Sequence, residues 1–277
     1  MSRSAVIQIP IRKVNNDEIV DGEDVLASEE PLEIRLVYGP VTHRMQKSIS
    51  VTMRTPGNDF ELARGFLYTE GIISSKEEVV SVKHCNGENE NVVKVELDEQ
   101  VAIDMSKLER HFYTTSSCGV CGKSSIEAVR VVCKNIAEDN GLRFESNIIY
   151  QLPDILRRAQ MVFERTGGLH ASALFDKEGN LILLREDVGR HNALDKLIGA
   201  ALEDGLLPLN KYLLLLSGRA SFELIQKATM AGIKIVAAVG APSSLAVQMA
   251  EDAGITLIGF LRGERFNIYT GKERIII

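Results

Sequence analysis

The chain has 277 residues, 45% of them hydrophobic and 25% charged, and its formal net charge is −6 at pH 7, which fits a globular protein of one large or two modest domains. This charge excludes a global basic field for nucleic acid, so an anionic ligand needs a local cluster of basic side chains. No apolar run reaches the roughly 18 residues of a membrane-spanning helix, and no signal-peptide pattern opens the chain. We therefore expect a cytoplasmic protein without membrane insertion.

The first half of the chain predicts a smaller α+β domain over residues 1–145. Residues 15–31 are acidic and weakly hydrophobic, which indicates a loop or an exposed edge. Hydrophobic periodicity then predicts a hairpin of strands over 32–37 and 45–53, a helix over 59–70, and strands over 79–84 and 91–97. In the second hairpin strand, Ile49, Val51 and Met53 alternate with other residues, so we expect these three on one face.

A segment of small, polar and glycine residues, 113–125, interrupts this periodicity. It contains Cys118 and Cys121 in a Cys-x-x-Cys arrangement, just before a helix predicted from Ser125. A helix N-terminus stabilises a thiolate and lowers the thiol pKa, and Lys123 adds a nearby positive charge. The segment therefore predicts an accessible sulfur nucleophile, which is what a persulfide carrier needs.

Two other uses of a Cys-x-x-Cys remain open. It can be half of a structural zinc site, but the remaining cysteines, Cys85 and Cys133, are single and far apart. It can also be a thioredoxin-type redox pair, which follows a strand and carries an aromatic flank, and the nearest aromatic residue here, Tyr113, is too distant. We favour the sulfur nucleophile over both.

The second half of the chain predicts an α/β domain. Its periodicity indicates a helix over 153–165, strands over 170–175 and 181–185, a helix over 192–203, a strand over 212–217, a helix over 222–231, a strand over 234–239, a helix over 243–253, and strands over 256–261 and 266–269. Apolar strands that alternate with helices indicate a sheet covered on both faces. Ligands of such sheets usually bind beyond the carboxyl ends of the strands.

Polar segments containing glycine and arginine lie where these strands begin or end. Glycine-rich turns present backbone N–H groups to phosphate, and arginine adds bidentate hydrogen bonds. Because such segments recur at several strand ends, we predict one pocket for a polyanionic, nucleotide-like ligand. The candidate phosphate contacts are Arg190, Arg219, Arg262 and Arg265, the candidates for proton handling are His170 and His191, and Gly168 lies in the glycine-rich link before His170.

These motifs resemble the FdhD family of formate dehydrogenase accessory proteins. The matching segments are 115–123 (TSSCGVCGK), 166–171 (TGGLHA), 185–196 (REDVGRHNALDK), 217–223 (SGRASFE), 240–246 (GAPSSLA) and 259–262 (GFLR). They are long, occur in order and cover the chain from about residue 31 to residue 269.

The resemblance implies a sulfurtransferase, or sulfur carrier, that takes persulfide sulfur from a cysteine desulfurase. The sulfur passes to the molybdenum bis(molybdopterin guanine dinucleotide) cofactor before this cofactor is inserted into formate dehydrogenase. The cofactor is then a bound substrate, and no permanent cofactor or metal is implied. Cys118 would carry the persulfide, and Cys121 is the second family cysteine. The implied cofactor-binding residues are Phe260, Leu261, Arg262, Gly263, Glu264 and Arg265.

The resemblance also implies a homodimer and a C-terminal domain, over residues 146–277, with a cytidine-deaminase-like three-layer α/β/α fold. That fold raises zinc-dependent deamination as a rival activity. Deaminases need a His-x-Glu motif, and neither His170 nor His191 is followed by such a glutamate. Two further alternatives are a cofactor chaperone without sulfur chemistry and a zinc-stapled binding module.

Overall fold

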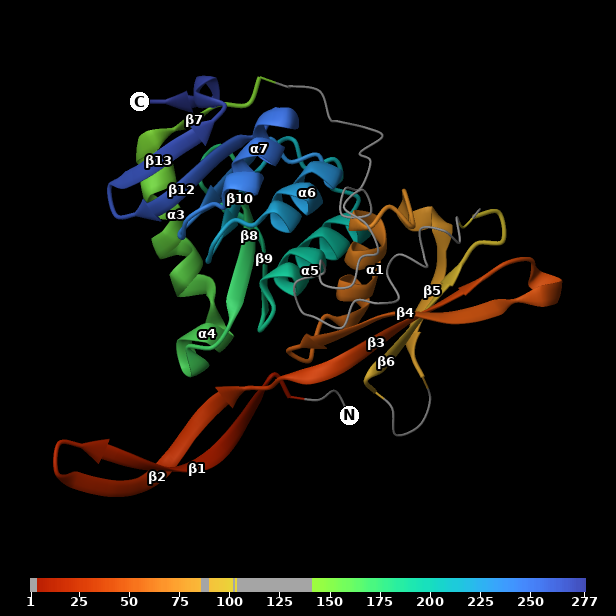
Figure 1. The fold of residues 1–277 in the computed structure, drawn as a ribbon, viewed down its shortest axis with the longest axis horizontal. Coiled ribbons are helices and arrows are strands. Elements are labelled where there is room, and N and C mark those ends of the chain that lie inside the picture. The colour runs from red at the N-terminus through yellow and green to blue at the C-terminus, as the bar shows by residue number, and fades with distance from the viewer. Residues whose placement is uncertain (1–3, 86–89, 102, 104–140) are drawn as a thin grey trace.

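The computed structural model describes residues 4–85, 90–101, 103 and 141–277. Cys118, Cys121 and the helix predicted after them lie outside these residues. The described chain forms an N-terminal two-stranded ribbon, a four-stranded sheet and a six-stranded sheet, with a short two-stranded pairing near the C-terminus (Figure 1). No helix in this described part is both long enough and apolar enough to span a membrane.

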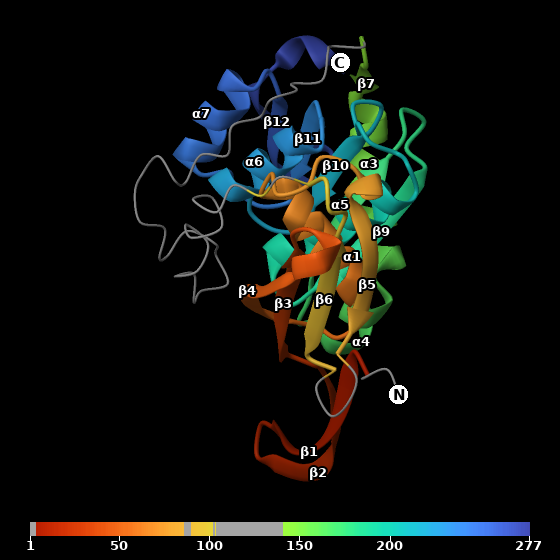
Figure 2. The same cartoon turned by 90° about the vertical axis from the view of Figure 1, so that its right-hand side faces the viewer.

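The ribbon extends away from the rest of the molecule in both views (Figures 1 and 2). It pairs β1 (Val6–Asn15) with β2 (Glu18–Ala27) in antiparallel register. Its exposed apolar side chains are Ile7, Val14, Ile19, Val20 and Leu26. Most of the acidic segment over 15–31 is thus a regular, exposed strand, so the predicted exposure is confirmed and the loop is not.

The four-stranded sheet has the order β4-β3-β6-β5 and packs one face against α1. Its elements are β3 (Glu30–Tyr38), β4 (Met45–Arg54), α1 (Asp59–Thr69), β5 (Val79–His84) and β6 (Val92–Leu97). The buried side chains of Leu32, Ile34 and Leu36 on β3 meet Leu62 and Leu67 of α1 in one apolar cluster. The predicted hairpin, helix and two strands are confirmed.

One expectation about β4 is wrong. Ile49 is 1% exposed, whereas Val51 is 55% and Met53 is 37% exposed. The β3–β4 register shifts between Ile34 and Arg35, so Ile49 is the extra residue of a β-bulge. A bulge inverts the alternation of side chains along a strand, and the three residues therefore do not share a face.

The six-stranded sheet has the order β13-β12-β11-β10-β8-β9. Strands β10, β11 and β12 are parallel, and β8, β9 and β13 pair antiparallel with their neighbours. The strands are β8 (His170–Phe175), β9 (Leu181–Asp187), β10 (Leu213–Leu216), β11 (Ile235–Ala238), β12 (Thr256–Arg262) and β13 (Arg265–Thr270). The order of strands and helices predicted for this half is confirmed.

Helices cover both faces of this sheet, as predicted (Figure 1). One face packs against α5, α6 and α7, and the other against α3, because alternate strand residues such as Leu214 and Leu215 enter different apolar clusters. The elements are α3 (Ser146–Ala159), α4 (Met161–Thr166), α5 (Arg190–Glu203), α6 (Phe222–Met230) and α7 (Ser244–Asp252), with β7 (Phe144–Glu145) paired to β14 (Ile275–Ile276). The finer likeness to cytidine deaminases and the division at residue 145 stay predictions.

The helix predicted over 153–165 begins earlier and is broken. α3 starts at Ser146, contains Pro153 in its interior and ends at Ala159, and Gln160 separates it from α4. Proline is favoured in the first turn of a helix, which is why the sequence suggested a start there. Ile149 and Leu152 are fully buried in the core under the sheet, and this packing outweighs the local cost of the proline.

The two sheets are joined where α1 and α5 pack along each other (Figure 2). Gly65 of α1 and Gly199 of α5 lie at the crossing. A Cβ atom on Gly65 would collide with the backbone of Asp195, and one on Gly199 with the backbone of Glu61. Only glycine permits this close approach of the two backbones, so α1 and α5 pack closely at the junction between the sheets.

Candidate functional site

The carboxyl edge of the six-stranded sheet is the end of the sheet at which strands β10, β11 and β12 finish and β8 starts. They meet there because β8 is antiparallel to β10, with Leu216 paired to Ser172. His170, the first residue of β8, pairs with Asp187 at the end of β9. The predicted residues His170, Arg190, His191 and Arg219 come from three separate segments of the sequence, and the last three lie close enough to His170 at this edge to act on its charge.

His170 lies in a cationic environment. A Cβ atom on Gly218 would lie 3.2 Å from Nδ1 of His170, so the imidazole sits directly on this glycine turn. Burial lowers the pKa of His170, and the positive charges of Arg190, His191 and Arg219 lower it further, against the opposing charge of Asp187. Burial and these charges therefore favour the neutral form of the imidazole, and the arginines supply positive charge around it.

Arg190 opens α5 and is available to a ligand. Its Nε is buried and has no hydrogen-bond partner among the described residues. The preceding Gly189 offers no side chain to cap the helix, so it leaves the first-turn N–H groups that follow it without a side-chain cap of its own. Arg219 is exposed and forms no ion pair within the described ranges. This arrangement of donors suits a phosphate group.

His191 is held differently. Its Nε2 lies 3.3 Å from Oγ of Ser221 and 3.8 Å from Oε2 of Glu223. Burial would raise the pKa of the Glu223 carboxyl, but the interactions with His191, with its own backbone N–H and with Ser221 outweigh burial and lower it to about 2. Both partners face the same ring nitrogen, so the group lacks the relay geometry of a hydrolase triad.

Glu223 was not among the predicted site residues. Its position in the SGRASFE segment carries a weak signal, because a glutamate in the first turn of a helix is usually a simple cap. Only the tertiary structure places it beside His191. Arg185, in another of the polar segments, turns away from the edge: its Nη2 donates to Glu61 of α1 at 2.8 Å.

The segment from Phe260 to Arg265 spans the end of β12, the turn at Gly263 and Glu264, and the first residue of β13. Phe260 is 42% exposed and has a positive φ of 54°, an unusual conformation for a bulky residue, and its N–H donates to the carbonyl of Gly240. Leu261 is fully buried in the apolar core, so its side chain is not available to a ligand. Arg262 and Arg265 pair across the turn and are exposed.

This turn and the His170 cluster occupy two parts of the same edge, because β11 and β10 lie between β12 and β8. A ligand in contact with both must therefore be extended. Gly168 is exposed in the link before β8, and a Cβ atom there would lie 3.7 Å from Cβ of Ala27 at the base of the ribbon. The structure thus places Gly168 at the margin of the cluster.

The cysteines predicted to carry the chemistry, Cys118 and Cys121, lie outside the described residues. Within the described ranges Cys85 is a free, half-buried thiol at the end of β5. The same ranges contain no group of three or more His, Cys, Asp or Glu side chains placed to hold a metal ion.

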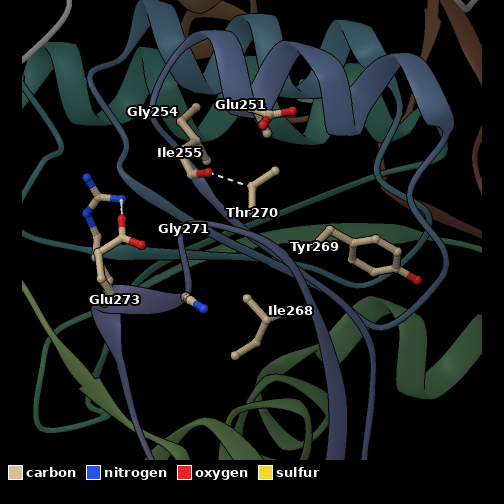
Figure 3. Close-up of a pocket in the computed structure, with 11 residues that line it drawn as sticks. Glu251, Gly254, Ile255, Ile268, Tyr269, Thr270, Gly271 and Glu273 are labelled. Carbon is tan, nitrogen blue, oxygen red and sulfur yellow. Dashed lines mark hydrogen bonds and ion pairs between the residues drawn. The ribbon is translucent and has the colours of Figure 1, made fainter.

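A separate cavity lies away from the predicted residues (Figure 3). It has a volume of about 460 Å³ and lies where β12 begins and β13 ends, beside the last turn of α7. Thr270 closes one wall by donating from Oγ1 to the carbonyl of Ile255 at 2.7 Å. None of the predicted site residues lines this cavity, and no motif in the sequence pointed to it.

The sequence matches the model of the FdhD/NarQ family over residues 27–276. The chain belongs to this family. The resemblance found in the motifs is therefore confirmed over nearly the whole chain, including the segments of the carboxyl edge.

Relatives in the FdhD/NarQ family are highly similar to this chain. A protein of Streptomyces avermitilis named "Sulfur carrier protein FdhD" is 50% identical over 96% of this chain and 94% of its own length. Proteins of the same name from Mycobacterium tuberculosis and Sulfurisphaera tokodaii are 49% and 43% identical, over 96% and 98% of this chain and 96% and 99% of their own.

A solved structure shows the same FdhD/NarQ fold. The crystal structure of a protein from Desulfotalea psychrophila, described as a formate dehydrogenase accessory protein, superposes with a TM-score of 0.76 at 23% identity. The superposition covers 99% of this chain and 100% of the other. The likeness establishes that the arrangement of ribbon, sheets and helices is a shared fold.

Proposed function

We propose that this protein is a sulfur carrier that serves formate dehydrogenase. The observation that carries the proposal is the meeting of Arg190, Arg219 and His170 at one sheet edge, in a chain whose relatives are named sulfur carrier proteins. The edge supplies unpaired cationic donors for a polyanionic substrate, and the Cys-x-x-Cys segment supplies the sulfur chemistry. The substrate is the molybdenum bis(molybdopterin guanine dinucleotide) cofactor.

Loading of sulfur takes place at Cys118. Its thiolate attacks the sulfane sulfur of a cysteine desulfurase persulfide, forms a new S–S bond, and releases the desulfurase cysteine as a thiolate. Attack of Cys121 on the sulfur of Cys118 then releases the terminal sulfur at the oxidation level of sulfide and leaves a disulfide. This second role is one of two for Cys121; the other is to lower the pKa of the Cys118 thiol.

The carboxyl edge holds the substrate while this happens. Arg190 and Arg219 contact phosphate on one side of the edge, and the turn from Phe260 to Arg265 binds on the other side. The two are separated by two strands, which suits a substrate with two nucleotide arms. Leu261 takes part through its backbone alone, because its side chain is buried. The acceptor of the product is formate dehydrogenase.

Mass spectrometry after incubation with a cysteine desulfurase and free cysteine tests the sulfur step. We expect a gain of one sulfur atom on the peptide that contains Cys118, and its loss in C118A. C85A is the matched control, because Cys85 is the free thiol among the described residues, and it should load normally. Loading that persists in C118A contradicts the proposal.

A cofactor chaperone without sulfur transfer is the alternative, favoured by the free Arg190 Nε at the edge, which needs no cysteine to bind phosphate. In that case C118A would support full formate dehydrogenase activity in cells that lack the native protein. A cytoplasmic location and a homodimer, for which the exposed apolar side chains of the ribbon offer a surface, complete the proposal. Light scattering of the purified protein tests the dimer.

A further inference from the structure

Asp187 lies directly behind the carboxyl edge and makes no contact with solvent. It ends β9, three residues before Arg190, and its side chain is 0% exposed. A buried carboxylate is costly unless it is paired and fully hydrogen-bonded. The groups that contact the two oxygens of Asp187 therefore indicate its structural role.

Both oxygens of Asp187 are occupied. Oδ1 accepts hydrogen bonds from the backbone N–H of Gly189 at 2.8 Å and from Nδ2 of Asn192 at 3.1 Å. Oδ2 accepts from the backbone N–H of Thr55 at 3.1 Å and pairs with Nζ of Lys196 at 2.7 Å. A carboxylate with four partners has no capacity left for a ligand, so Asp187 acts on other residues.

Thr55 comes from the other half of the chain. It follows β4, and its hydroxyl accepts the backbone N–H of Val188 at 3.2 Å while its carbonyl accepts Nζ of Lys196 at 2.8 Å. The loop 187–189 is thus clamped between the four-stranded sheet and α5. Gly189 fits tightly, because a Cβ atom there would lie 3.1 Å from Nδ2 of Asn192.

We propose that Asp187, together with Thr55 and Lys196, is a positioning device that aims Arg190 and the N-terminus of α5 at the phosphate of the bound substrate. The loop has no freedom to relax because each of its backbone N–H groups at 188 and 189 is held. The N-terminal half of the chain thereby sets the affinity of a site built on the C-terminal half. This inference rests on the proposed function, which makes the edge a phosphate site.

The test uses the full chain and measures the dissociation constant for GDP by calorimetry. The main variant is D187N/K196M, which removes both buried charges together, since D187N alone would leave Lys196 buried and unpaired. T55V is the milder variant, because it removes only the acceptor of the Val188 N–H. We expect GDP to bind about tenfold more weakly to D187N/K196M, and two- to threefold more weakly to T55V, as is usual when a supporting contact is lost.

The matched control is E61Q/R185Q. Arg185 lies on the same strand as Asp187 and also joins the two halves of the chain, through Glu61 of α1, but it does not touch the loop. This control should bind GDP within about twofold of the unmodified protein, because changes at sites that share no contact act independently. Equal losses in the control and in D187N/K196M overturn the inference.

A double-mutant cycle with R190A separates positioning from general damage to the fold. If Asp187 acts by aiming Arg190, D187N/K196M adds little further loss in the R190A background. If the losses of GDP affinity caused by R190A and by D187N/K196M multiply fully in the combined variant, the inference is wrong, and the proposed phosphate site is unaffected. If D187N/K196M does not fold, the same comparison is made with T55V, in the unmodified protein and in the R190A variant. If the unmodified protein binds neither GDP nor pyrophosphate, the proposed site fails and the inference fails with it.

Discussion

The two large sheets differ in how the polar side chains at the ends of their strands are paired. The six-stranded sheet is sealed on both faces, and its polar groups gather at one edge, where Arg190 and Arg219 have no acidic partner among the described residues. At the end of β4 in the four-stranded sheet the polar groups turn inward: the N–H of Thr55 donates to Asp187, and the buried Arg54 pairs with Asp59. One sheet therefore offers charge to a ligand, while the other supports the first.

The largest expected effect, on the free energy of unfolding, comes from forcing apart α1 and α5, the helices that join the two sheets. Substitution Gly65→Ala places a Cβ atom against the backbone of Asp195, and we expect a loss of about 3 kcal/mol in the free energy of unfolding, because neither backbone can retreat. Urea denaturation measures it. Gly22→Ala in the exposed ribbon is the control, since a Cβ there meets only Lys13 at 3.9 Å. Equal stability of the two variants would show that the helices are not closely joined.

The next effect tests the charge that the six-stranded sheet presents. We expect R190A or R219A to weaken GDP binding by about 10- to 100-fold, the usual worth of a charge-assisted hydrogen bond. R12A is the control, because Arg12 is an equally charged side chain on the ribbon, where its pair with Asp21 is exposed. Isothermal titration of the three variants measures the dissociation constants. A comparable loss in R12A would point to a nonspecific effect of net charge.

A smaller effect concerns the acid that holds His191. The pKa of Glu223 is lowered to about 2 from an ordinary 4.5, so this carboxyl stabilises the fold above about pH 4.5 and the stabilisation is lost as the pH falls toward 2. Because the side chain is 23% exposed, we expect on the order of 1 kcal/mol at neutral pH. E223Q should lose this increment at pH 7 and match the unmodified protein near pH 2. Unfolding curves across this range decide it, with E18Q on the ribbon as control.

The smallest effect is the pH dependence of ligand binding through His170. Burial and the neighbouring Arg190, His191 and Arg219 lower its pKa. A bound phosphate opposes those charges and raises this pKa, so binding takes up a proton and GDP affinity should increase severalfold as the pH falls below about 6.5. H170Q removes this component. If the pH profile of H170Q is identical to that of the unmodified protein, the imidazole does not face the phosphate.

Much of the second half of the chain was predictable because the signals were local. Alternation of apolar and polar residues and helical spacing of apolar residues depend only on neighbours in the sequence. The strand ends carrying His170, Arg190 and Arg219 followed from the same pattern. The structure brings these three residues together at one edge, and their role in binding a ligand stays a prediction.

Most of the features that the sequence did not predict depend on contacts between residues far apart in the chain. The bulge at Ile49 and the interior Pro153 depend on packing against other elements, which outweighs local preference. Glu223 lies next to His191 only because α6 and α5, which carry them, pack side by side on one face of the six-stranded sheet. In β1, Ile7, Ile9 and Ile11 alternate with other residues, a local strand signal that was missed, whereas the acidic β2 carries little periodic apolar pattern.

By itself the sequence determined the family, the order of elements from 170 to 270 and the residue types at the strand ends, because motif spacing and hydrophobic periodicity are properties of short segments. The tertiary structure alone decided which groups are partners. Asp187 and Thr55 are 132 residues apart in the chain, and no local pattern links them. They meet because α1 and α5 pack through glycines, and that close packing is a property of the folded whole.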